Sequence, residues 1–187
     1  MKRWIWLILA GAVLLAGWRP SPREPDALAL VRVLGVDGSG PVELTAVCGG
    51  EDQGNQSRGQ CAAEDFPKAL ELLPWSGTEE LSLTSVSYLL AGRDVDLEKV
   101  LLEVLRNEEL GASATVWLAD GGAAALLGTC KDPASVLELL TRQGADAPTA
   151  AQALAALLDG QTLALPRLRG GEDGPVWLGQ EEWRAVG

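Results

Sequence analysis

The most informative absence from this chain of 187 residues is that of histidine. Without an imidazole, the chain cannot build a Ser-His-Asp or Cys-His catalytic site, nor a zinc site that uses histidine. A lysine, carboxylate or thiol mechanism would need a coherent set of side chains, and the sequence shows none. We therefore predict a protein that is not an enzyme, with no catalytic residue, metal site or cofactor.

Positive charge is also scarce. The chain has 15 Lys and Arg against 26 Asp and Glu, which gives a formal net charge of -11. Phosphate binding requires clustered basic side chains, and no basic stripe follows Lys2-Arg3. The charge pattern therefore predicts that nucleic acid is not a partner.

Aromatic residues make up 5% of the chain, and seven of them are tryptophan. Hydrophobic residues nevertheless reach 47%, so a core of leucine, valine and alanine can form and global disorder is excluded. The length allows one ordinary domain together with a targeting segment.

Residues 1–18 have the pattern of an export segment. Lys2-Arg3 supplies a positive flank, and the apolar run over 4–17 has about 14 residues, which suits a secretory signal better than a membrane-spanning helix of ~20 residues. Trp4 and Trp18 flank this run, as aromatic residues do at membrane interfaces. A buried helix of the fold is the structural alternative. We predict a signal peptide or signal anchor that places the rest of the chain on the extracytoplasmic face of a membrane.

The end of this segment resembles the start of a bacterial lipoprotein, with one difference. Leu15-Ala16-Gly17 is followed by Trp18, where a lipoprotein has the cysteine that receives the lipid. Cleavage near this point and retention as an anchor both stay open. Residues 19–26 contain three prolines, which favour a stiff, extended spacer.

Residues 27–187 read as an α/β or α+β domain, with a mixed β-sheet flanked by helices. Turn residues between two apolar segments predict a hairpin at the start, and apolar residues at helical spacing predict the helices. The expected elements are a hairpin of 27–37 and 42–50, a polar loop over 49–60, a helix over 62–73, a strand over 81–92, a helix capped by Asp94 or Asp96, a strand over 112–121, helices starting near Pro133 and at Thr149, and a second hairpin within 176–187 that turns at Gly179 to Glu181.

Two sets of residues are candidates for chemistry or contact. Cys48 and Cys61 flank the polar loop, and a disulfide between them would contribute ~3 kcal/mol by closing that loop; two free cysteines are the alternative. Trp117, Trp177 and Trp183 could form a protein contact or line a ligand pocket, or they could belong to the core.

Several short segments, taken in order, resemble the N-terminal domain of the Ger(x)C spore germination proteins, the C-subunits of germinant receptors. The resemblance covers nearly the whole chain from residue 14, although each segment is weak alone. The segments are Gly17-Trp18-Arg19, Asp26-Ala27-Leu28-Ala29, Leu34-Gly35-Val36-Asp37, Leu105-Arg106-Asn107-Glu108, Ala119-Asp120-Gly121, and Leu165-Pro166 followed by 176–187.

The resemblance implies a membrane-associated accessory subunit of a germinant receptor, held at the inner spore membrane and active in receptor assembly. Its partners would be the polytopic A and B subunits, and the germinant itself is not expected to bind directly. Two departures from the family are the missing lipid-accepting cysteine and an end at Gly187, near the end of the family's first domain. The alternative is a generic exported domain that binds a solute or another protein.

Overall fold

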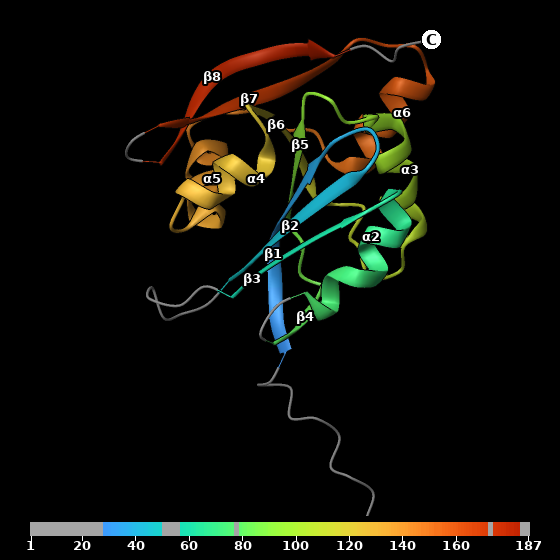
Figure 1. Cartoon of the computed structure of the whole chain (residues 1–187). Helices are drawn as coiled ribbons and strands as arrows, with labels where there is room; N and C mark the ends of the chain where they lie inside the picture. The colour runs from blue at the N-terminus through green and yellow to red at the C-terminus, as the bar shows by residue number, and fades with distance from the viewer. Residues whose placement is uncertain (1–27, 50–56, 77–78, 172–173, 184–187) are drawn as a thin grey trace, which may run out of the picture.

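The computed structural model describes residues 28–49, 57–76, 79–171 and 174–183. The predicted signal segment 1–18, the spacer 19–26, Trp4 and Trp18 lie outside these residues. The described residues form a mixed sheet flanked by helices (Figure 1), which confirms the predicted fold class. The eight strands are β1 (Leu28–Asp37), β2 (Val42–Cys48), β3 (Arg58–Ala63), β4 (Glu80–Ser82), β5 (Tyr88–Gly92), β6 (Thr115–Asp120), β7 (Leu163–Gly171) and β8 (Gly174–Trp183).

Parallel strands occupy the centre of the sheet and antiparallel strands its two sides. The strand order is β3-β2-β1-β5-β6-β7-β8, and the short β4 pairs with the start of β1. Strands β1, β5, β6 and β7 run parallel, so their carboxyl ends lie along one edge. Strands β2, β3 and β8 are antiparallel to their neighbours. The predicted hairpin at the start of the domain is therefore confirmed by the pairing of β1 with β2.

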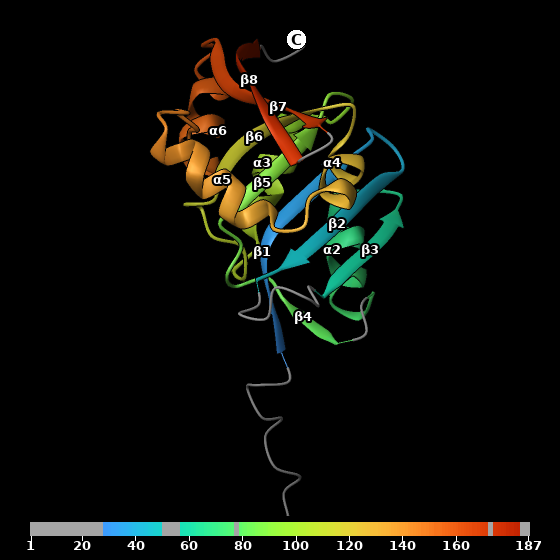
Figure 2. The same cartoon turned by 90° about the vertical axis from the view of Figure 1, so that its left-hand side faces the viewer.

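Helices cover both faces of the sheet, and each face has its own core (Figure 2). Alternation along β6 shows how the two cores are filled: Val116 and Leu118 point to one, and Trp117 and Ala119 to the other. On the first face lie α2 (Phe66–Leu72), α3 (Leu97–Arg106) and α6 (Ala150–Leu158); on the second lie α4 (Ala123–Thr129) and α5 (Pro133–Arg142).

Most of these helices begin at a side chain that caps them locally. Asp96 accepts a hydrogen bond from the Lys99 amide at the start of α3, as predicted. Thr149 and Gln152 form a complete capping box at the start of α6. Such caps satisfy amides that have no partner within the helix, so these helix starts are encoded by neighbouring residues.

The predicted polar loop over 49–60 is wrong at residues 58–60, whereas residues 50–56 lie outside the described residues. Residues 58–60 belong to β3, in which Gln60 stands opposite Thr45 and Gly59 opposite Ala46. The strand continues to Ala63, so the predicted helix over 62–73 begins later, at Phe66, where Asp65 caps it. The helix ends at Leu72 and passes into the 3-10 turn η2 (Leu73–Trp75).

Two other strand predictions need correction. The segment 81–92 forms β4 and β5 rather than one strand, because the two pair with different stretches of β1. The predicted hairpin within 176–187 is absent from its described part, 176–183, which lies in the single strand β8. Gly179 has a positive φ of 106° beside a register shift opposite Arg167 and Leu168. It therefore marks a β-bulge and not a turn.

Candidate functional site

The first feature of interest lies at the carboxyl ends of the parallel strands, where Asp37 ends β1. Its two carboxylate oxygens accept hydrogen bonds of 2.7 Å from the backbone amides of Ala123 and Ala124. These amides are the first of α4, which has no side-chain cap from its own N-cap residue, Gly122. Asp37 therefore supplies the cap of α4 from a distant part of the sequence.

Two glycines make room for this arrangement. A Cβ on Gly35 would lie 2.8 Å from Leu127 Cδ1 and 3.0 Å from Ala123 Cβ, so glycine lets α4 approach β1 closely. A Cβ on Gly92, at the end of β5, would collide with the Asp37 carboxylate. The segment Leu34-Gly35-Val36-Asp37, which carries part of the family resemblance, therefore has a structural role, because it seats α4 on the sheet.

Beside this cap, five charged side chains form a network that joins β8 to the ends of β5, β6 and β7. Asp120 accepts from Arg169 at 2.6 Å and pairs with Arg93 at 3.1 Å. Glu181 lies 2.9 Å from both Arg93 and Arg167. The hydrogen bond from Arg169, aided by the charges of Arg93 and Arg167, holds the pKa of Asp120 below its ordinary value. All three guanidinium groups are paired with carboxylates, so the network holds β8 to the ends of the neighbouring strands.

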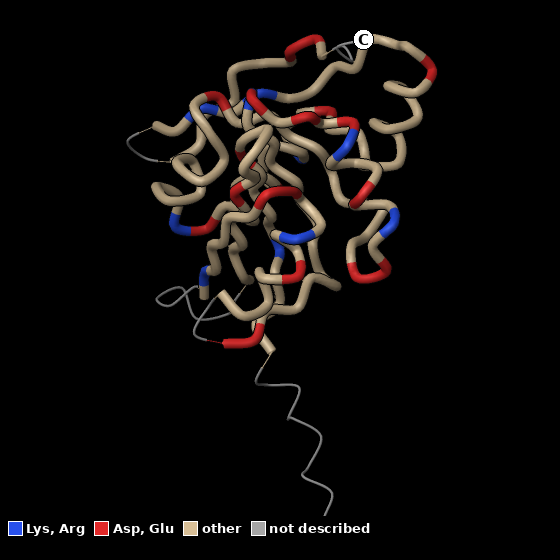
Figure 3. Tube along the Cα trace, turned by 45° about the vertical axis from the view of Figure 1, so that its right-hand side comes forward, with Lys and Arg blue, Asp and Glu red and all other residues tan. Residues whose placement is uncertain are grey.

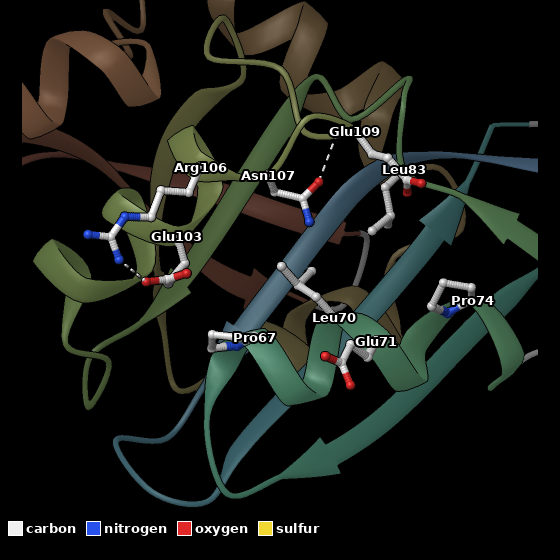
Figure 4. A pocket seen from close by; sticks show the side chains of 9 residues that line it. All are labelled: Pro67, Leu70, Glu71, Pro74, Leu83, Glu103, Arg106, Asn107 and Glu109. Atoms are coloured by element: carbon white, nitrogen blue, oxygen red, sulfur yellow. Dashed lines mark hydrogen bonds and ion pairs between the residues drawn. The ribbon is translucent and has the colours of Figure 1, made fainter.

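The second feature is a groove between α2 and α3 that extends along α3 from Asp96 to Arg106, and Figure 4 shows its part near the C-terminal end of α3. It consists of two adjoining hollows of about 390 and 400 Å³ that share Pro67, Glu103 and Arg106. The first hollow is lined by Pro67, Leu70, Glu71, Pro74, Leu83, Glu103, Arg106, Asn107 and Glu109. The second adds, among others, Val42, Phe66, Val100 and Leu102, which give it an apolar floor.

Acidic side chains predominate around this groove. The lining contains six of them, Glu64, Asp65, Glu71, Asp96, Glu103 and Glu109, against two basic ones, Lys99 and Arg106. Both basic groups are occupied: Arg106 pairs with Glu103 at 2.8 Å and Lys99 with Asp96 at 2.6 Å. An amphipathic segment with positive charge suits such a groove better than an anionic solute does.

The cysteines do not form the predicted site. Cys48, Cys61 and Cys130 are free, and Cys61 stands opposite Leu44 in the β2–β3 register. Cys48 lies four residues further along β2, ~13 Å away at the rise of a strand, whereas a disulfide requires Cα atoms within ~7 Å. The Cys48–Cys61 disulfide is therefore wrong for this structure, and the alternative of free thiols holds. Cys61 instead donates a hydrogen bond to the Ala69 carbonyl at 3.2 Å.

Burial keeps these thiols protonated. It raises the pKa of Cys48 to about 11, with a smaller contribution from Glu79. Burial also raises the pKa values of Cys61 and Cys130. Since the thiolate is the reactive form of cysteine, none of the three is activated as a nucleophile.

The three tryptophans predicted as contacts have different positions. Trp117 is wholly buried in the second core and donates a 3.0 Å hydrogen bond to Thr115 Oγ1, so its prediction as a contact residue is wrong. Trp183 is partly buried and packs against the first core. Trp177 is 37% exposed, and its chain neighbours on β8, Val176 and Leu178, are also exposed. We call Val176–Leu178 the β8 strip.

Sequence reasoning missed Trp75, which is 68% exposed at the end of η2 and is the most exposed tryptophan among the described residues. The segment Leu73-Pro74-Trp75-Ser76 contained a signal, because a large aromatic residue in a turn after a helix is poorly placed to enter a core. It also missed the α2–α3 groove, whose lining comes from segments far apart in the chain and leaves no local pattern.

Neither a metal cluster nor a membrane-spanning helix occurs in the described ranges. Within 28–49, 57–76, 79–171 and 174–183, no group of three or more Cys, Asp or Glu side chains is arranged to hold a metal ion. No helix in the same ranges has the length and apolar character that crossing a membrane requires. The charged residues of the described chain are interspersed, with basic positions beside acidic ones (Figure 3).

Comparison with known proteins gives one structural likeness. No family model and no curated protein matches the sequence. Among solved structures, the chain matches the crystal structure of the GerBC protein with a TM-score of 0.42 and 15% sequence identity. The match covers 82% of this chain and 48% of that one, so this chain spans about half the length of GerBC. At this sequence identity and TM-score, the likeness says nothing about the activity or partners of this chain.

Proposed function

We propose that this protein is a non-enzymatic accessory subunit of a spore germinant receptor, associated with a membrane through its N-terminal segment. It would lie on the extracytoplasmic face of the inner spore membrane and contribute to receptor assembly. Its partners would be the polytopic A and B subunits, which sense the germinant.

The observation that carries the proposal is the physical role of the resembling segments. Gly35 and Asp37, from Leu34-Gly35-Val36-Asp37, seat and cap α4, which begins at Ala123, two residues after Ala119-Asp120-Gly121. One resembling segment thus caps, over a separation of 86 residues, the helix that follows another resembling segment. Such residues preserve an architecture rather than a reaction, which fits a subunit that acts by contact.

Two surfaces are available for docking to receptor subunits. The α2–α3 groove has an apolar floor and an acidic rim, which suits a positively charged segment of a partner. The β8 strip exposes Trp177, and an exposed aromatic side chain is typical of contact surfaces. We expect Trp177 to be the main contact residue of this surface.

Affinity purification of the tagged full chain from spore membranes of the source organism tests the proposal. We expect the polytopic A and B subunits to be recovered with it, and we expect Trp177→Ser to lower their recovery several-fold. Leu158→Ser is the matched control, since Leu158 is 62% exposed on α6, away from the β8 strip. Recovery of the wild-type chain without A and B subunits would contradict the proposal.

The alternative of an exported solute-binding domain has one observation in its favour, the volume of the α2–α3 groove. Hollows of about 400 Å³ fall within the size range of ligand pockets. Equilibrium titration of the full chain with amino acids, sugars and nucleosides separates the two functions. Saturable binding that is lost in Arg106→Ala would favour the solute-binding domain, whereas no binding is expected of the accessory subunit.

A further inference from the structure

Exposed apolar side chains gather at the end of the molecule where β1 begins. Leu28 and Leu30 on β1, Leu72 at the end of α2 and Trp75 in η2 are all exposed. Trp75 has the largest exposed fraction among the large hydrophobic residues of the described chain. We call these four residues the apolar pole.

The four residues belong to one end of the fold although they come from two segments. β1 begins beside β4, with Leu28 opposite Glu80 and Leu30 opposite Ser82, and β4 packs against η2. Figures 1 and 2 show β4 and the start of β1 at the same extremity of the molecule, away from α6.

The two sides of the sheet both contribute to the apolar pole. Ala29 packs against the first core, so Leu28 and Leu30 face the opposite side by the alternation of a strand. Leu72 ends α2, which covers the first core, and Trp75 follows it at the end of η2. This end of the molecule therefore carries exposed apolar side chains on both sides of the sheet.

The chain that precedes this extremity determines what can cover it. Leu28 follows the apolar run 4–17 and the spacer 19–26. The residues between Gly17 and Leu28 reach at most ~35 Å when fully extended, about the diameter of a small domain. A membrane that holds the apolar run is therefore tethered to the domain at Leu28, within the apolar pole.

The charges near the apolar pole restrict the kind of membrane surface that can cover it. Glu79 and Glu80 lie at or beside β4, and Glu79 accepts a 2.8 Å hydrogen bond from Ser57 Oγ. The chain has a net charge of -11, so anionic headgroups would not attract it electrostatically. Trp75 supplies the amphipathic ring that favours the interfacial layer of a bilayer.

We infer that the apolar pole rests in the headgroup layer of a zwitterionic bilayer and so fixes the orientation of the domain on the membrane. The inference rests on the proposed function, because the N-terminal segment must first hold the chain at the membrane. Trp75 and Leu72 enter the interface together with Leu28 and Leu30, and the sheet then stands upright with its β7 and α6 end toward the aqueous phase.

Spin labels on the full chain in phosphatidylcholine vesicles test this inference. The background carries Cys61→Ala, because Cys61 is the only cysteine of the chain that is not buried in the described structure. Labels are placed at Trp75→Cys, at Leu72→Cys as a second position, and at Leu158→Cys as the control on α6. We expect the first two to collide several-fold more often with lipid-soluble oxygen, relative to a water-soluble nickel complex, than the control does.

The outcomes separate the inference from the proposed function. If the chain floats with the vesicles but all three labels are equally accessible to nickel, the pole does not touch lipid and the inference is overturned, whereas membrane association stands. That result would leave the pole to a protein partner. If the chain does not float with the vesicles, the proposed membrane association itself fails.

Discussion

The carboxylate of Asp37 accepts a 2.7 Å hydrogen bond from the amide of Ala123, which lies 86 residues further along the chain. This contact joins the end of β1 to the start of α4 and satisfies an amide that the helix cannot satisfy itself. The same carboxylate also accepts from Ala124. One side chain therefore determines where α4 begins.

Replacing this cap should destabilise the domain. We expect Asp37→Ala to lower the free energy of unfolding by about 1–2 kcal/mol, the usual cost of losing an N-cap. Asp37→Asn keeps one acceptor oxygen and should cost less. Urea denaturation followed by circular dichroism measures both, and equal midpoints for wild type and Asp37→Ala would contradict the role given to Asp37.

Close approach between β1 and α4 gives a second expectation. Gly35→Ala would place a methyl group 2.8 Å from Leu127 Cδ1, and overpacking of this kind costs about 1–3 kcal/mol. Gly128→Ala on the same helix is the matched control, since nothing lies within 4 Å of its added Cβ. The control should stabilise the helix by up to about 1 kcal/mol. Thermal unfolding that ranks the two variants in the opposite order would refute the packing argument.

The network around Asp120 should respond to acid. Its pKa is lowered from 3.8 in the folded state, chiefly by the hydrogen bond from Arg169. A carboxyl group with a lowered pKa stabilises the fold above its unfolded-state pKa, and this contribution is lost as the pH falls through the folded-state value. We expect Asp120→Asn to have a lower Tm than wild type at neutral pH, and the difference to shrink below pH 3.8. A difference in Tm that stays constant over this range would exclude the network as its cause.

The cysteines should behave as three protected thiols. At pH 8 the buried Cys48, with a pKa of about 11, and the buried Cys130 should resist alkylation by iodoacetamide until urea unfolds the chain. Cys61, which is partly exposed, should react first but slowly. Intact mass spectrometry without reductant measures this, and a mass lower by two hydrogens would reveal a disulfide that this structure does not accommodate.

Local signals in the sequence predicted part of this fold correctly. Asp96 and Thr149 are followed by apolar residues at helical spacing, and each caps the expected helix. The turn beginning at Asp37 separates two apolar segments and produces the β1–β2 hairpin. In these cases the residues that determine the structure are neighbours in the sequence.

Where distant residues determine the structure, the predictions failed. α4 is only seven residues long and takes its cap from Asp37, so no neighbouring residue marks its start. β3 lacks β-branched residues and is a strand because β2 pairs with it. Gly179 looks like a turn residue, but pairing with β7 converts it into a bulge.

The candidate site residues also divide into those encoded by neighbouring residues and those that depend on distant parts of the fold. A predicted disulfide depended on the register of β2 with β3, which places Cys61 opposite Leu44. The exposure of Trp177 and the burial of Trp117 depended on which strands have a covered face. The ordered segments that resemble the Ger(x)C proteins could be recognised from sequence, whereas the α2–α3 groove and the apolar pole required the fold.

The most direct test of the central claim is the germination of spores that lack this protein. We expect their response to nutrient germinants to be strongly slowed, and restored by the full chain but not by a chain without residues 1–18. The leader-deleted chain should still fold, which circular dichroism of the purified variant checks. Unchanged germination kinetics in the deletion strain, or full rescue by the chain without residues 1–18, would contradict a membrane-held receptor subunit.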